Sequence, residues 1–287
     1  MRYAVLLCAA ALAACGEPTT PVELAAAPVA FERIVAGERD LWRVRLDGTD
    51  LLKLTADTGE DRWPSVAAGS IYYVYFHNVP APIFAIPTTG GSAVQITTVS
   101  AAYDEAAISA DGNSFTFTRS GKVFVSDRSG ANAHRLTTSG TVTVEAAPMW
   151  SPDGKSIAFV SSGNAASADI YVATLTTGAA KAVVSTSDAE VQPCWSPDGK
   201  QIAFARGTTT GTHLFTIDLA TAKEKQLTSA SGTQSLPSWL PDGRIVFAVG
   251  SASARTLYWL DPRVKGTPSH QVPGAIDVAG KITAIPQ

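Results

Sequence analysis

Residues 150–159 of the chain read WSPDGKSIAF, and the same pattern returns as WSPDGKQIAF at 195–204 and as WLPDGRIVF at 239–247. A weaker copy, ISADGNSFTF, occupies residues 108–117, and eroded copies occupy 64–73 and 278–285. The aspartates of the four clearer copies are 42, 45 and 44 residues apart; they are Asp111, Asp153, Asp198 and Asp242. A regular period of about 40 to 50 residues indicates an array of repeated structural units.

Short runs of alternating apolar and polar residues, bounded by turn residues, fill each repeat, and such runs predict β-strands. One run with a central aromatic residue occurs six times, around Trp42, Phe84, Phe124, Tyr171, Phe215 and Tyr258. Four strands in a repeat of about 43 residues is the unit of a propeller blade. We therefore expect an all-β fold, a six-bladed β-propeller of four-stranded blades over residues 30–287.

The two ends of this domain complement each other. The first unit, which begins near Phe31, lacks an inner strand of its own, whereas the chain ends in a spare inner-strand pattern from Gly274 to Ile285. Unpaired strand edges are unfavourable, because their backbone groups lack hydrogen-bond partners. The C-terminal strand is therefore predicted to close the ring by pairing inside the first blade.

The Pro-Asp-Gly segments have the composition of tight turns. Proline presets φ, aspartate accepts hydrogen bonds from nearby backbone, and glycine adopts positive φ. Because each aspartate lies on a different blade, we expect turn residues rather than a row of catalytic or metal-binding carboxylates. Trp150, Trp195 and Trp239 are expected to pack between blades rather than to bind sugars.

The N-terminus has the features of a secretory signal. Arg2 precedes an apolar run from Ala4 to Ala14, which is too short to span a bilayer, and Leu12-Ala-Ala-Cys15 resembles a bacterial lipobox. We expect residues 1–14 to be a signal peptide, Cys15 to be lipidated, and residues 15–29 to be a tether. Cys8 would leave with the signal, so that Cys194 has no partner for an intramolecular disulfide.

The repeated Trp-Ser-Pro-Asp-Gly-Lys-x-Ile-Ala-Phe motif resembles the repeat of the TolB-like propellers, a periplasmic family related to WD40 repeats. The resemblance covers about residues 30–287 and implies a six-bladed propeller lipoprotein that binds partner peptides near its central channel. TolB itself has an additional α/β domain before its propeller, and the sequence between Cys15 and Phe31 has no room for one. A role in a Tol–Pal system therefore does not follow from the resemblance.

The face that carries the loops between second and third strands is the predicted ligand face. Polar residues stand three positions before the proline of each inner strand, or at the equivalent place, and should form a ring around the axis. The candidate ligand-binding residues are Asp61, Tyr103, Asp104, Glu105, Glu145, Glu190 and Gln234. We expect them to form an acidic channel mouth, which would concentrate cations and basic peptides. The alternative is that these carboxylates are solvated loop ends or pair with neighbouring cations such as Arg62.

Composition limits the functional classes. A formal charge of −3 argues against a nucleic-acid partner. The sequence has no His-Glu-x-x-His, Cys-x-x-Cys, P-loop or Gly-x-Ser-x-Gly motif, so we expect no enzyme activity, no catalytic or metal-ligating residue and no cofactor. A divalent cation in the channel stays open as an alternative.

The sequence thus predicts a monomeric, lipid-anchored scaffold of the cell envelope, in the periplasm or on the outer membrane, that binds a protein or peptide. A carbohydrate-active enzyme, for instance one that uses Glu145 and Glu190, and a polysaccharide-binding propeller are the alternatives.

Overall fold

A computed structural model describes residues 28–77, 80–99, 101–137, 144–162, 167–251 and 254–286. These residues form 24 β-strands, and no helix occurs among them, hence none long and apolar enough to cross a membrane. The predicted signal peptide, residues 1–14, and the predicted lipidation site Cys15 lie outside the described residues. The predicted tether, 15–29, is longer than the structure allows, because Pro28 and Val29 already belong to the first strand and Val29 is fully buried.

Five sheets contain all the strands. The first consists of β24 (Val278–Ala284), β1 (Pro28–Val35), β2 (Glu38–Arg45) and β3 (Leu52–Lys53). The second consists of β4 (Glu60–Ala67), β5 (Ser70–Phe76), β6 (Ile83–Pro87) and β7 (Val94–Gln95). The third consists of β8 (Asp104–Ile108), β9 (Ser114–Arg119), β10 (Lys122–Asp127) and β11 (His134–Arg135). The fourth consists of β12 (Glu145–Trp150), β13 (Ser156–Ser161), β14 (Asp169–Thr174) and β15 (Ala180–Val184).

The fifth sheet has eight strands and two halves, each with the strand order of the smaller sheets. One half consists of β16 (Glu190–Trp195), β17 (Gln201–Thr208), β18 (Gly211–Asp218) and β19 (Glu224–Gln226). The other consists of β20 (Gly232–Trp239), β21 (Ile245–Ser251), β22 (Ala254–Leu260) and β23 (Ser269–Ile276). With each half counted as one blade, the described strands make six sets of four.

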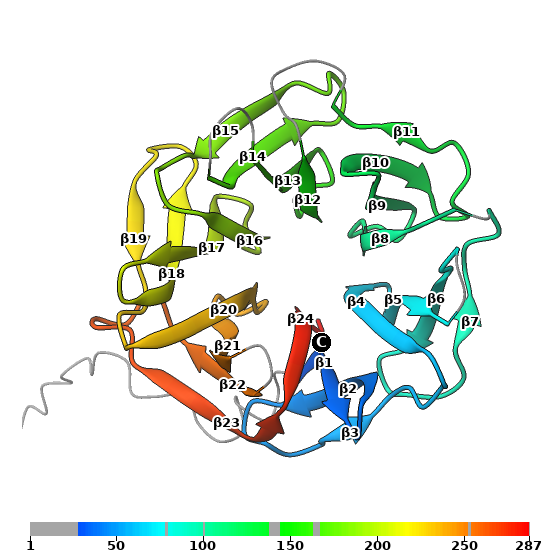
Figure 1. Cartoon of the computed structure of the whole chain (residues 1–287), viewed down its shortest axis with the longest axis horizontal. Coiled ribbons are helices and arrows are strands. Elements are labelled where there is room, and N and C mark those ends of the chain that lie inside the picture. Colours follow the sequence, from blue (N-terminus) through cyan, green and yellow to red (C-terminus); the bar gives the residue numbers. More distant parts are fainter. Residues whose placement is uncertain are drawn as a thin grey trace, which may run out of the picture.

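The sets are arranged radially around a central axis, with β24, β4, β8, β12, β16 and β20 innermost (Figure 1). Within each set, neighbouring strands of the meander are antiparallel, as in the pairing of β12 with β13 and of β13 with β14. This all-β propeller of four-stranded blades is the fold that the repeat predicts.

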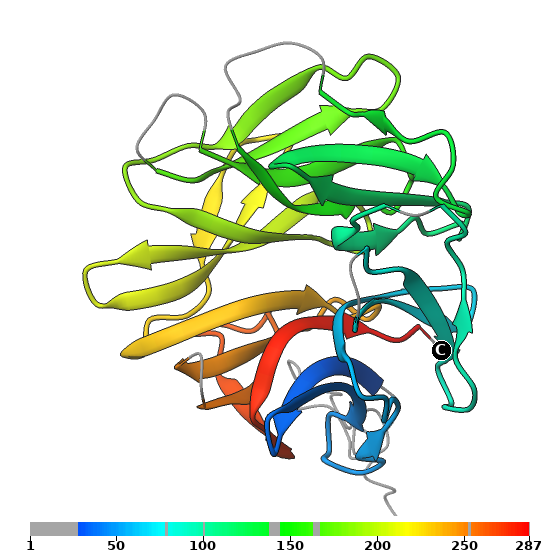
Figure 2. The same ribbon diagram turned by 45° about the vertical axis from the view of Figure 1, so that its right-hand side comes forward.

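Pairing of the last strand with the first closes the ring. Strand β24 is antiparallel to β1, with Val29 opposite Ala284 and Phe31 opposite Ile282, and Ile285 N donates to Pro28 O over 3.1 Å. Figure 2 shows β24 running alongside the strands of the first blade. The predicted closure by the C-terminal strand is therefore confirmed.

The Pro-Asp-Gly segments form the turns between inner and second strands. After β12, the Ser151 hydroxyl and Lys155 N both donate to Asp153 Oδ1, over 2.7 and 3.1 Å, and Gly154 has a φ of 68°. These hydrogen bonds, first that of Ser151, hold the pKa of Asp153 below its usual value. The turn after β16 repeats both bonds with Asp198. The aspartates are turn residues, as predicted.

The repeated tryptophans tie each blade to the preceding one. Trp150 Nε1 donates to Ala107 O over 3.1 Å, and Trp195 Nε1 donates to Met149 O over 3.2 Å. Trp195 is buried, and Trp239 is half-buried against the apolar core of β17, β18 and β21. The predicted inter-blade packing of these three residues is therefore confirmed.

One contact between blades was not predicted. Strands β18 and β20 pair in parallel, with Gly211 opposite Gly232 and Thr212 opposite Thr233. Gly211 has a φ of 138°, and a Cβ there would lie 2.2 Å from Gly232 O. Only glycine therefore permits this backbone approach, which joins the two halves of the eight-stranded sheet.

The closing strand gives a stability test with a matched control. Ile282 in β24 is 3% exposed and packs in the core that joins the first and last blades, whereas Ile276 in β23 is 44% exposed. We expect Ile282→Ala to lower the free energy of unfolding by about 2 to 5 kcal/mol, and Ile276→Ala by less than about 1 kcal/mol. Urea denaturation measures both, and equal losses would show that β24 does not contribute to the closed ring.

Candidate functional site

A β-bulge occurs at the same place in five inner strands. The pairing register shifts between Arg62 and Ser65 in β4, and equivalent shifts occur in β8, β12, β16 and β20. Each bulge contains one non-glycine residue with φ between 49° and 59°; these residues are Trp63, Glu105, Ala147, Gln192 and Leu236. A bulge interrupts the alternation of side chains along a strand. It thereby changes which residues face the axis.

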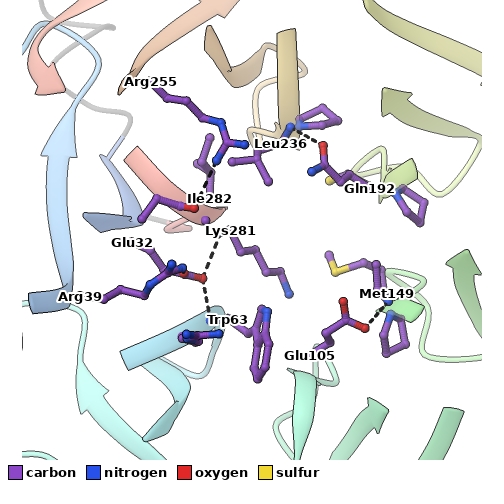
Figure 3. A pocket seen from close by; sticks show the side chains of 18 residues that line it. Glu32, Arg39, Trp63, Glu105, Met149, Gln192, Leu236, Arg255, Lys281 and Ile282 are labelled. Atoms are coloured by element: carbon purple, nitrogen blue, oxygen red, sulfur yellow. Dashed lines mark hydrogen bonds and ion pairs between the residues drawn. The ribbon is translucent and has the colours of Figure 1, made fainter. Parts of the chain in front are cut away.

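The bulged residues line an axial cavity of about 340 Å³. Every inner strand contributes to its wall, through Trp63, Glu105, Met149, Gln192, Leu236 and Lys281 (Figure 3). Arg39 and Arg255 also line it; each follows the loop between a second and a third strand. The cavity therefore lies toward the face where the sequence analysis expected a ligand.

Polar side chains of the bulged residues link successive inner strands, because they accept hydrogen bonds from backbone N–H groups of the next blade. Glu105 Oε2 accepts from Ala147 N over 2.8 Å, and Gln192 Oε1 accepts from Leu236 N over 2.7 Å. Each bond connects one blade to the next across the wall of the cavity (Figure 3).

Glu32 of β1 makes the most connections of this kind. Its Oε1 accepts from Trp63 N over 2.8 Å and from Lys281 N over 3.0 Å, and its Oε2 accepts from Arg39 Nη1 over 2.9 Å. The carboxylate packs so closely over Gly280 that a side chain at that position would overlap it. Glu32 thus joins the first strand, the last strand and the second blade.

The predicted acidic ring does not form at the channel mouth. Five of its members are at most 2% exposed and lie inside the protein; they are Asp61, Tyr103, Glu145, Glu190 and Gln234. Asp104 is half-buried in β8 and does not line the cavity. Of the predicted residues, Glu105 alone lines it. The physical reason is the bulge, because it turns the residue two positions further along each strand toward the axis.

The buried members of the ring are held by neighbours within the protein. Glu145 accepts from Val123 N and from the Thr137 hydroxyl, each over 2.6 Å. Glu190 Oε1 accepts from Arg206 Nε over 2.8 Å. Glu145 therefore connects its blade to the preceding one, whereas the pairing of Glu190 with Arg206 is the contact with a neighbouring cation that the sequence analysis left open.

The remaining two make similar contacts. Gln234 Oε1 lies 2.7 Å from Nδ1 of the buried His213, and the Tyr103 hydroxyl donates to Val99 O over 3.2 Å. These side chains have no route to a ligand in the channel.

Comparison with known proteins identifies the fold. A model of the TolB β-propeller domain matches residues 118–259. These residues belong to a TolB-like β-propeller domain. No curated protein sequence matches it significantly.

The solved structures that resemble this TolB-like propeller include two TolB proteins. TolB from Acinetobacter baumannii is 21% identical with a TM-score of 0.76, covering 92% of this chain and 68% of that one. A putative TolB from Agrobacterium tumefaciens is 16% identical with a TM-score of 0.67, covering 91% and 98%. An oligogalacturonate lyase in complex with manganese is 14% identical with a TM-score of 0.59, covering 85% and 73%. At these identities the likeness concerns the fold alone.

Charges around the cavity of the TolB-like propeller are mainly basic. Its wall contains four cations, Arg39, Arg62, Arg255 and Lys281, and two carboxylates, Glu32 and Glu105. Within the described residues, no group of three or more His, Cys, Asp and Glu side chains is placed to hold a metal ion. The cavity therefore differs in sign from the acidic mouth that the sequence predicted.

Burial shifts the pKa of several groups near the axis. It lowers the pKa of Lys281 to about 8, an effect that Cys194, Glu32 and Glu105 oppose. It raises the pKa of Glu32, although the hydrogen bonds from Trp63 N and Arg39 act in the opposite direction. The cavity is thus a poorly solvated environment in which an unpaired charge is costly.

The carboxyl group of Asp61 lies in an unfavourable environment for a charge. It is fully buried, and neither oxygen has a hydrogen-bond partner of normal geometry within the described residues. Burial, with smaller contributions from Asp40 and Asp57, raises its pKa to about 7, and the Thr55 hydroxyl only partly opposes this.

Asp61 gives a pH prediction. Because its pKa rises from 3.8 to about 7 on folding, the native state holds a proton that the unfolded chain releases. Stability should fall as pH rises from near 4 to near 7, and then level off. We expect Asp61→Asn to remove this decline and to be more stable than the wild type at pH 8, by at most roughly 4 kcal/mol.

Urea denaturation at several pH values measures the effect. Asp188→Asn, at an exposed position, serves as the control and should keep the wild-type pH dependence. A wild-type profile that rises from pH 4 to 7, with no change in the Asp61 variant, would contradict the assignment.

Proposed function

We propose that this chain is a non-enzymatic, lipid-anchored propeller of the bacterial cell envelope that binds a protein or peptide partner at the axial cavity. The observation that carries the proposal is the cavity itself, whose wall draws a residue from every inner strand. Such a concave site with a few placed polar groups is the usual form of a binding site. Because every blade contributes, a bound segment would contact the whole ring at once.

The hydrogen bonds of the two cavity carboxylates, Glu32 and Glu105, favour binding over catalysis. A general acid or base needs a free oxygen within hydrogen-bond reach of the substrate. Both oxygens of Glu32 and one oxygen of Glu105 accept bonds from backbone N–H groups or from Arg39. These side chains are thus committed to holding the ring together.

A carbohydrate-active enzyme is the second candidate, because the oligogalacturonate lyase in complex with manganese has the same fold. Against it, Glu145 and Glu190 are at most 1% exposed, and hydrogen bonds within the protein hold Glu145 to the preceding blade and Glu190 to its own. The tryptophans that could form a polysaccharide platform pack between blades. The binding scaffold is therefore the function that the cavity supports best.

Photo-crosslinking in intact cells tests the binding site. p-Benzoylphenylalanine would replace Trp63, which lines the cavity, or Tyr258, a half-buried aromatic residue of β22 outside it. We expect a discrete protein adduct from position 63 and none from position 258, because only the first faces a bound partner. Equal yields at both positions, or no adduct at position 63, would overturn the proposal.

The anchor has its own test. Mass spectrometry of the mature protein is expected to find a lipid-modified N-terminus at Cys15, after removal of residues 1–14. Cys15→Ser should leave the membrane fraction, since stable anchoring needs the acyl chains. An unmodified N-terminus elsewhere, or an unchanged distribution of the variant, would contradict the lipid anchor.

A further inference from the structure

Lys281 places a cation in the middle of the axial cavity. Its side chain extends across the cavity from β24, between Trp63 and Met149 and toward Glu105 (Figure 3). Its backbone N–H donates to Glu32, but within the described residues its ammonium group makes no hydrogen bond and has no carboxylate at ion-pair distance. An ammonium group in a poorly solvated cavity without a counter-ion is unfavourable.

Among the described residues, the two carboxylates of the wall form no ion pair with this cation. Glu32 is occupied by two backbone N–H groups and by Arg39. Glu105 Oε2 accepts from Ala147 N, and the Thr118 hydroxyl lies 3.4 Å from the same oxygen. Both acids are therefore held at the wall by the propeller's own donors.

The neighbouring arginines add to the positive potential. Arg39 pairs with Glu32 and Arg62 with Glu60, whereas Arg255 donates only to the carbonyl oxygen of Ala279, over 3.2 Å. The Arg255 Nε atom is buried and has no hydrogen-bond partner within the described residues. Lys281 and Arg255 thus outnumber Glu105, the one carboxylate of the wall without an ion-pair partner among the described residues, and the cavity keeps a net positive charge.

We propose that the cavity binds a carboxylate group of an acidic peptide, with Lys281 as its ion-pair partner. The inference rests on the proposed function and specifies the chemistry of the partner segment. It reverses the expectation from the sequence, in which an acidic mouth would favour basic peptides.

The shape of the cavity supports a side-chain carboxylate on a short aliphatic stem. A volume of about 340 Å³ is near the lower end for ligand sites, so it admits a residue or two rather than a folded domain. Trp63, Met149 and Leu236 supply apolar wall on the path to Lys281. A glutamate side chain has methylene groups to contact this wall and a charge at its end.

The pH dependence of binding follows from the groups around Lys281. Cys194 of β16, Glu32 of β1 and Glu105 of β8 raise its pKa, but burial dominates and lowers the value to about 8. Arg39, Arg62 and Arg255 complete the charged lining from β2, β4 and β22. If the protonated ammonium binds the carboxylate, affinity should fall about tenfold between pH 7 and pH 9, as that form is depleted.

Isothermal titration calorimetry with the full chain in detergent micelles tests the proposal. The probes are tetraglutamate, tetraglutamine and tetralysine peptides, together with free glutarate and inorganic phosphate. We expect tetraglutamate to bind at pH 7 at least about tenfold more tightly than tetraglutamine, because it alone supplies the counter-charge. Tetralysine should not bind. Glutarate or phosphate binding as tightly as tetraglutamate would show a site for small free anions and would overturn the peptide assignment.

Variants separate the role of Lys281 from folding. Lys281→Met should weaken tetraglutamate binding at least about tenfold while keeping the thermal midpoint, since it removes a half-buried charge and keeps the backbone bond to Glu32. Lys281→Arg should bind within about threefold of the wild type and lose the decline between pH 7 and pH 9, because arginine stays charged. Lys155→Met, at an exposed position, is the matched control and should bind as the wild type does.

The outcomes distinguish this inference from the proposed function. If tetraglutamate does not bind, or binds Lys281→Met as well as the wild type, the carboxylate site is wrong even where position 63 forms an adduct. If tetraglutamate binding depends on Lys281 but position 63 forms no adduct in cells, the envelope partner is wrong and the carboxylate site stands.

Discussion

The propeller depends on the pairing of its last strand with its first. Strand β24 supplies the inner edge that β1 lacks, and Ile282 and Phe31 face each other in that pairing. Glu32 reinforces it, because one buried carboxylate accepts backbone bonds from β24 and from β4 and pairs with Arg39 of β2. Without β24, two inner strands would lose neighbours and the axial cavity would lose one side of its wall.

The fold could be predicted from the sequence because its cause is local and repeated. Each Pro-Asp-Gly turn is stabilised within about five residues, as the bonds of Asp153 to Ser151 and Lys155 illustrate. The tryptophans before these turns bond to the preceding blade, so their period of recurrence also reports the packing between blades. A spare inner-strand pattern at the C-terminus then left ring closure as the consistent topology.

The axial cavity lies toward the face on which the sequence analysis placed the ring, but the residues that line it stand two positions further along the inner strands. Strict alternation puts Glu145 and Ala147 on the same side of a strand. The left-handed backbone at Ala147, with φ of 49°, breaks that alternation, so Glu145 turns into the protein and Ala147 faces the axis. The side chains of the bulged residues share no property, but a proline directly follows Trp63, Ala147, Gln192 and Leu236. Because proline within a sheet is confined to edge strands, strand starts and bulges, it is the sequence signal that could have located four of the five bulges. The sequence analysis predicted an acidic channel, whereas the wall of the cavity is mainly basic. It did so because Lys281 and the arginines come from positions that were not assigned to the channel.

The parallel pairing of β18 with β20 joins two neighbouring blades more firmly than the other blades are joined. Among the described strands it is the one β-ladder between two blades, and Gln192 and Leu236 are bonded across the same boundary, whereas other boundaries have isolated main-chain bonds such as that from Glu145 N to Gly121 O. We therefore expect these two blades to move together, while thermal motion is larger at boundaries that side chains and isolated main-chain bonds hold. The wall formed by β16 and β20 would then keep its shape, while the opposite wall, which Trp63 of β4 and Glu105 of β8 form, could shift relative to it.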